Sequence, residues 1–146
     1  MRIALVVSYI TLTAGCSLFM HSIERPTATV RDVSVSSAGL GGVTGQVQMD
    51  VTNPNGVGVP LSGIDWQLSV GGARAVTGAV ELQQTIPARG VAPVTTSLSI
   101  GMLDAAQVAT VLASGGRDYR IDATLHFSTS VGQLDVDVHK TGTLAF

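Results

Sequence analysis

The sequence predicts an antiparallel β-sandwich of about seven strands with one short helix. Apolar and polar residues alternate through most of the chain, and a period of two is typical of strands with one buried and one solvated face. Clusters of Asn, Gly and Pro separate these stretches at short intervals, as the turns of a sandwich require. No strand–helix–strand repetition is present to favour a parallel sheet.

Composition bounds the class of protein before any motif is considered. A chain of 146 residues allows one domain. Charged residues make up only 12%, against about a quarter in a typical globular protein. Most polar side chains on the surface must therefore be uncharged. The net charge is −2 and the sequence has no basic cluster, so it does not predict a surface that binds nucleic acid. A single cysteine excludes an internal disulfide.

Residues 1–15 are predicted to be a lipoprotein signal peptide. Arg2 supplies a positive charge, and the apolar stretch Ile3–Leu12 follows it. This stretch is shorter than the about 20 apolar residues that a membrane-spanning helix needs. Its length is typical of the hydrophobic region of a signal peptide.

The four residues Thr13-Ala14-Gly15-Cys16 resemble the lipobox of bacterial lipoproteins. The resemblance implies cleavage before Cys16 and fatty acylation, for example with palmitate, at this cysteine. Leu is more usual than Thr at position 13, so the match departs there. Ser17, in place of the Asp that favours inner-membrane retention, implies the outer membrane, facing the periplasm. The alternative is an ordinary secretory signal followed by a cysteine by chance.

Residues 16–28 are expected to form a lipidated tether, because they contain Pro26 and show no clear period. The domain would then extend over 29–146. Its first strand is predicted over 29–37, where Val33 and Val35 share a face and Val30 lies at the entry. The second strand is predicted over 43–52.

The connection 53–63 is the longest turn-rich stretch and opens with Asn53, Pro54 and Asn55. Asn tolerates left-handed backbone angles, and Pro fixes φ and donates no backbone hydrogen bond. Two interpretations stay open. The three residues could form a recognition loop, or the side-chain amides could cap the backbone and shape the turn.

Trp66 has inward parity in the third strand and is expected in the core rather than on a ligand platform. Gly78 is a candidate β-bulge in the fourth strand. Residues 83–93 carry two prolines and are expected to form an edge or a loop. The third, fourth and fifth strands are predicted over 61–70, 74–82 and 94–100.

The period changes once, at 102–113, where apolar residues fall at three- and four-residue spacing and predict an amphipathic helix. Asp104 suits its first turn, and Gly115-Gly116 ends it. Alternation then returns in two final strands, at 119–128 and from Leu134 onward. Leu144 and Phe146 are expected to pack at the end of the chain.

The last two strands bring two histidines opposite two carboxylates when their apolar residues are aligned. In that register His126 faces Asp135, and His139 faces Asp122. Two such pairs on one face could hold a metal ion. The alternative is a pair of exposed cross-strand charge contacts, each worth at most about 1 kcal/mol. No arrangement of acid, base and nucleophile emerges from the remaining residues, and we predict a protein that is not an enzyme and uses no cofactor or metal.

A family resemblance rests on the middle of the chain. Asn53-Pro54-Asn55 after a strand, Pro60-Leu61, a strand with an inward aromatic at 64–70 and a Thr/Ser-rich strand at 92–100 resemble the type 2 late embryogenesis abundant proteins. Their domain is also called the water stress and hypersensitive response domain. The resemblance covers 29–146 and implies a fibronectin-III/immunoglobulin-like β-sandwich with a helix. Trp66 departs from the Tyr or other apolar residue that is more usual in the family.

The resemblance implies a role in desiccation and other stress, with protection of other proteins and no established site residues. We therefore expect a lipid-anchored envelope protein that protects proteins or envelope components under desiccation or osmotic stress. Its partners would be the membrane, through acyl chains on Cys16, and an envelope protein. The alternative is a periplasmic binding or assembly module that recognises a partner strand or an apolar ligand.

Overall fold

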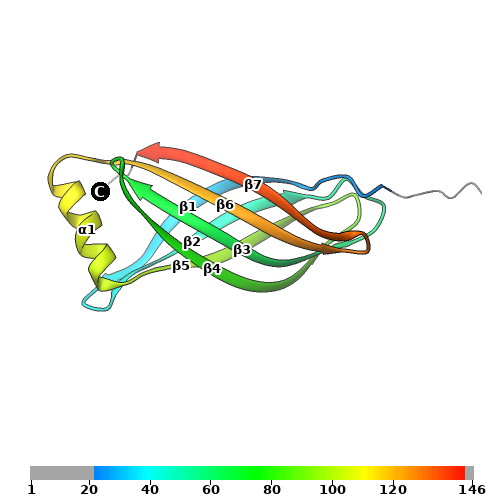
Figure 1. The fold of residues 1–146 in the computed structure, drawn as a ribbon, viewed down its shortest axis with the longest axis horizontal. Coiled ribbons are helices and arrows are strands. Elements are labelled where there is room, and N and C mark those ends of the chain that lie inside the picture. Colours follow the sequence, from blue (N-terminus) through cyan, green and yellow to red (C-terminus); the bar gives the residue numbers. More distant parts are fainter. Residues whose placement is uncertain (1–21, 144–146) are drawn as a thin grey trace, which may run out of the picture.

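The computed structural model describes residues 22–143, which form two antiparallel sheets packed face to face with a helix at one end (Figure 1). One sheet has the strand order β1-β2-β5 and the other β4-β3-β6-β7. The predicted antiparallel sandwich is confirmed. The elements are β1 (Thr27–Gly39), β2 (Gly42–Thr52), β3 (Val59–Val70), β4 (Ala73–Ile86), β5 (Val91–Ile100), α1 (Met102–Ala113), β6 (Asp118–Thr129) and β7 (Gly132–Thr143).

The strands run along the length of the molecule, so the connections gather at two ends (Figure 1). The end that we call the N-terminal end holds the segments 22–26, 53–58, 87–90 and 130–131. The opposite, helical end holds the turns 40–41 and 71–72 together with α1. The β2–β3 and β4–β5 connections, both at the N-terminal end, each pass from one sheet to the other.

The core lies between the sheets and is built from the inward residue of each alternating pair. In β5, for example, burial alternates without a break from Ala92 to Ile100. Trp66 is buried with this core, as its parity predicts. The largest fully buried apolar side chains are Phe127, Met49, Leu61, Ile64, Ile86, Ile121 and Leu125.

Strand β1 begins at Thr27, two residues before the predicted start of the domain. Its register with β2 shifts between Val30 and Asp32. Because such a shift changes which face a side chain occupies, Val30 and Val33 both reach the core although they are an odd number of residues apart. This irregularity is not visible in a simple period of two.

The predicted edge or loop at 83–93 is strand on both sides of a short turn. Strand β4 continues to Ile86 and β5 begins at Val91. Both are edge strands, which tolerate proline because a missing N–H can face outward. The carbonyl oxygen of Pro93 faces β4 and accepts a hydrogen bond from Nε2 of Gln84, 3.1 Å away. Pro93 therefore lies in an edge strand, and Pro87 lies in the short turn that joins the two edge strands.

The prediction of a bulge at Gly78 is wrong, because this residue pairs in regular register with Trp66. A Cβ atom at Gly78 would lie 2.3 Å from Cζ2 of the Trp66 indole. On the other side of Trp66 the cross-strand neighbour is Ala123. Gly78 thus makes room for the single tryptophan of the chain.

The helix matches its predicted bounds, Met102–Ala113. Between residues 22 and 143, no helix is long and apolar enough to cross a membrane. Cys16, and Leu144 and Phe146 with their expected packing, lie outside the described residues.

Gly78→Ala should destabilise the protein by about 1–3 kcal/mol, the usual cost of overpacking a core, because the new methyl group would collide with the indole. Urea unfolding followed by Trp66 fluorescence measures the loss. Gly39→Ala is the matched control, since no heavy atom lies within 4 Å of its added Cβ. Equal stabilities of the two variants would contradict the assigned role of Gly78.

Candidate functional site

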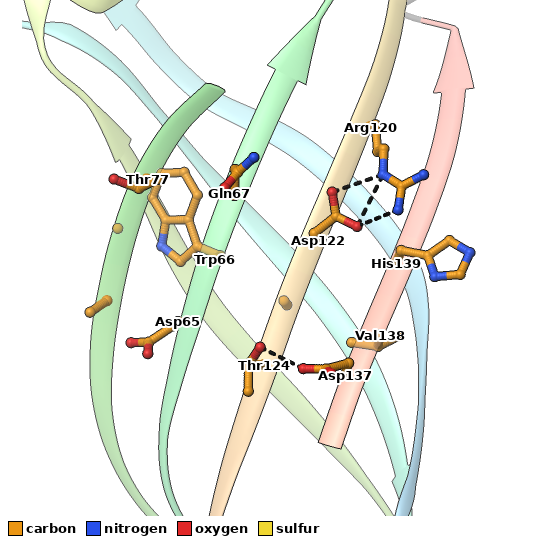
Figure 2. Close-up of a pocket in the computed structure, with 13 residues that line it drawn as sticks. Asp65, Trp66, Gln67, Thr77, Arg120, Asp122, Thr124, Asp137, Val138 and His139 are labelled. Carbon is orange, nitrogen blue, oxygen red and sulfur yellow. Dashed lines mark hydrogen bonds and ion pairs between the residues drawn. The ribbon is translucent and has the colours of Figure 1, made fainter. Parts of the chain in front are cut away.

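A broad depression of about 740 Å³ covers the outer face of the four-stranded sheet (Figure 2). The antiparallel register places outward side chains in two rows across its strands. One row is Thr77, Gln67, Asp122 and His139, and the other is Ala79, Asp65, Thr124 and Asp137. The strand alternation that fills the core with apolar groups therefore gives this face a polar floor.

Most carboxylates of this face are already engaged within the protein (Figure 2). Asp122 accepts hydrogen bonds from the Arg120 guanidinium, at 2.8 Å from Nε and 2.7 Å from the terminal nitrogen. This pairing lowers the pKa of Asp122 and raises that of Arg120. Thr124 donates its hydroxyl to Asp137 at 2.7 Å. The face can offer many weak polar contacts but little unpaired charge.

His126 lies at the edge of this face and joins three strands. Its Nδ1 is 2.7 Å from Oδ1 of Asp135 on β7, as the predicted register requires, and its Nε2 is 2.9 Å from Oδ2 of Asp65 on β3. In the imidazolium form both nitrogens donate. The pKa of His126 is raised, first by the bond to Asp135 and then by that to Asp65, and the pKa of Asp135 is lowered chiefly by His126.

The second predicted pair, Asp122 and His139, is aligned in register, but the Asp122 carboxylate turns to Arg120 instead (Figure 2). The carboxylates around His126 bind opposite sides of its ring and do not converge on one point. Between residues 22 and 143, no three or more His, Cys, Asp or Glu side chains are grouped so that they could hold a metal ion. The contacts that are present match the alternative of cross-strand charge pairs.

The predicted recognition loop lies at the N-terminal end, and its asparagines are used structurally. Asn53 is fully buried. Its Nδ2 donates to the carbonyl oxygens of Val57, Ile86 and Pro87 at 2.8–3.2 Å. Its Oδ1 accepts from the backbone N–H and the side-chain amide of Asn55, each at 2.9 Å. These bonds hold the β2–β3 and β4–β5 connections together.

Asn55 extends the same network to the segment before β1. Its Nδ2 donates to the carbonyl oxygen of Glu24 at 2.9 Å, and its Oδ1 accepts from the Glu24 N–H at 2.8 Å. Its own carbonyl oxygen accepts from the N–H of Arg89. Arg89 has a φ of 52°, which is uncommon outside glycine, and this bond helps to hold it. A role of Asn53, Pro54 and Asn55 in recognition remains a prediction.

Neither the long-range contact of His126 nor that of Asn55 could be predicted from the sequence. Asp65 meets His126 because β3 pairs with β6, and Asn55 meets Glu24 across 31 residues. The density of Asn and Pro at 53–55 was the one signal that marked the loop.

The pKa of His126 should lie above the ordinary value of about 6.5 and should fall toward it in Asp135→Asn. Because the pKa is raised on folding, the stability that this contact adds is present below the unfolded pKa. It is lost as the pH rises through the folded value. An NMR titration of the His126 ring measures this pKa in the wild-type protein and in Asp135→Asn. Asp137→Asn, on the same strand but paired with Thr124, is the control, and an unmoved pKa in Asp135→Asn would argue against the contact.

Asn53→Ala should lower the free energy of unfolding by on the order of 2–4 kcal/mol, because it leaves several buried polar groups without partners. Gln84→Ala removes one exposed side-chain hydrogen bond and should cost less than about 1 kcal/mol. Urea denaturation of both variants tests the difference. Equal losses would show that the Asn53 network adds no special stability.

Comparisons with known proteins place this fold. The family model for late embryogenesis abundant proteins, LEA_2, matches residues 48–142. A solution structure from Arabidopsis thaliana is similar over 86% of this chain and 84% of its own, with 17% identity and a TM-score of 0.72. A crystal structure from Archaeoglobus fulgidus has 14% identity and a TM-score of 0.62, with 86% of this chain and 99% of its own covered. No curated protein sequence gives a significant match. This chain belongs to the LEA_2 family of late embryogenesis abundant proteins.

Proposed function

We propose that this protein is anchored by lipid in the cell envelope and protects proteins or envelope components during desiccation or osmotic stress. Membership of the LEA_2 family supports a stress-related protein of the late embryogenesis abundant type, a family that is in general non-enzymatic. The family match over 48–142 is the observation that carries this proposal. The lipobox-like stretch that ends at Cys16 supports the anchor.

The outer face of the four-stranded sheet suits a protective role of this kind. Most of its carboxylates are bonded to Arg120, Thr124 or His126, so few charges remain to bind one partner strongly. Thr and Gln side chains bind water or a client backbone with similar strength, since hydrogen bonds exchanged with water have a small net free energy. Such a face keeps its hydration and makes many weak contacts.

A binding module is the second candidate, and the helical end favours it. Leu40 and Leu103 are 93% and 79% exposed there, and Met102 lies beside Leu103 in the chain. Only Asp104 is charged in α1, and none of its residues with a described side chain is fully buried. Exposed apolar side chains that lie together can mark a protein contact.

Addition of a partner's strand is the less favoured form of this second candidate. At each of the two seams between the sheets, one side chain bonds the backbone of the facing edge strand. Gln84 of β4 donates to Pro93 of β5, and Nζ of Lys140 of β7 donates to the carbonyl oxygen of Arg31 of β1 at 2.9 Å. These bonds favour a partner that binds the helical end by apolar contact over one that adds a strand to a sheet edge.

Deletion of the gene should lower survival after drying or osmotic shock, and the wild-type gene should restore it. The Cys16→Ala variant should restore less, because it would lose the anchor. Intact mass and membrane fractionation show the acylation state of each protein. Unchanged survival of the deletion strain under these stresses would reject the protective role, and an unacylated, soluble wild-type protein would reject the anchor.

The variant Leu103→Asp separates the two candidates. Leu103 is exposed, so the substitution should leave the fold intact, which circular dichroism checks. Full rescue of the deletion strain by this variant favours weak, dispersed protection. Loss of rescue with an intact fold would favour a partner at the helical end.

A further inference from the structure

We infer that the N-terminal end of the sandwich rests on the bilayer that anchors Cys16, through Val57 and Val131, so that the helical end points away from the membrane. This inference rests on the lipid anchor of the proposed function. It adds an interaction surface and an orientation that the family match does not contain.

The point where the chain enters the sandwich is fixed by contacts. Pro26 is buried and Ile23 is half-buried. The backbone of Glu24 makes a two-way hydrogen-bonded pair with the Asn55 amide, at 2.8 and 2.9 Å. The Arg25 guanidinium donates to the carbonyl oxygen of Asp135 at 2.5 Å. The first of these contacts is made by Ile23, so the stretch of sequence between Cys16 and the sandwich ends at Ser22.

The short stretch between Cys16 and the sandwich determines which end of the sandwich lies near the lipid. Six Cα–Cα steps separate Cys16 from Ser22, and they span at most about 20 Å when fully extended. Strand β1 has 13 residues, which corresponds to roughly 40 Å at the usual rise per residue. The N-terminal end is always within reach of the headgroups, whereas the helical end reaches them only if the sandwich lies flat.

The N-terminal end carries apolar side chains suited to such a contact. Val57, in the β2–β3 connection, is 59% exposed, and Val131, in the β6–β7 turn, is 70% exposed. Valine at a loop tip can enter the boundary between headgroups and acyl chains, as apolar groups of peripheral proteins do. Because the anchor makes this contact intramolecular, a weak attraction is enough to populate it.

Charge at this end does not oppose the contact. Arg25, Arg89 and Glu24 lie in its segments, and Asp135 of β7 lies beside Arg25, so the two signs nearly balance. An anionic bilayer is then neither strongly repelled nor strongly attracted. The orientation depends on the apolar tips and on the fixed entry of the chain.

Spin labels at the two ends test the orientation. Acylation consumes the only native thiol, so the substitutions Val131→Cys and Leu40→Cys each supply a unique labelling site. The acylated proteins are placed in vesicles of phosphatidylethanolamine and phosphatidylglycerol. In the vesicles, the label at 131 should show a several-fold higher ratio of oxygen accessibility to nickel-complex accessibility than the same label shows in solution. The solution reference carries Cys16→Ala, so that it is not acylated and keeps a single labelling site. The label at 40 should show no change.

Two further variants connect the effect to the tips. Adding Val57→Asp should reduce the membrane signal of the label at 131, because a carboxylate is costly to place at the apolar boundary. Adding Leu103→Asp, at the helical end, should leave that signal unchanged. Circular dichroism confirms that both variants are folded.

Each outcome has a separate meaning, because intact mass is measured first. An unacylated native protein overturns the anchor and this inference together. An acylated protein whose label at 131 stays as accessible to the nickel complex as in solution overturns the orientation alone. Protection of the label at 40 also overturns it, since the sandwich would then lie flat or contact lipid through its helical end.

Discussion

The N-terminal end of this sandwich depends on the hydrogen bonds of one buried side-chain amide, that of Asn53. The β2–β3 and β4–β5 connections pass between the sheets, and Asn53 bonds both. A buried amide is costly unless every donor and acceptor is paired. The two connections can therefore take only the arrangement that satisfies Asn53. Asn55 then brings the entering chain into the same network.

The two faces of the four-stranded sheet follow from one alternation. Inward residues such as Ile64 and Leu125 fill the core, and their outward neighbours Asp65 and Thr124 line the depression. Pairing across strands then decides which polar groups meet. His126 reaches a carboxylate on each flanking strand, so the outer face stabilises the strand order by contacts between side chains, while the core stabilises it by burial.

Local patterns predicted the elements well, because each strand has one apolar face and the helix has a different period. The register of the last hairpin, and with it the contact of His126 with Asp135, followed from aligning apolar residues. The pairing of β3 with β6 and the contact of Asn55 with Glu24 could not be predicted, since they join segments far apart in the chain. Gly78 was misread because glycine in a strand marks either a bulge or a close neighbour, and only the position of the Trp66 indole distinguishes the two.

Residue-resolved amide hydrogen exchange tests the central claim most directly. The N–H groups of Asn53, Asn55 and Arg89 lie in connections but bond to Gly90, to the Asn53 side chain and to Asn55, each at 2.9 Å. If this network holds the two connections together, these amides should exchange as slowly as those of the buried strands, through global unfolding. Exchange as fast as at the exposed turn residue Gly41 would contradict the account and show that the connections open independently of the sheets.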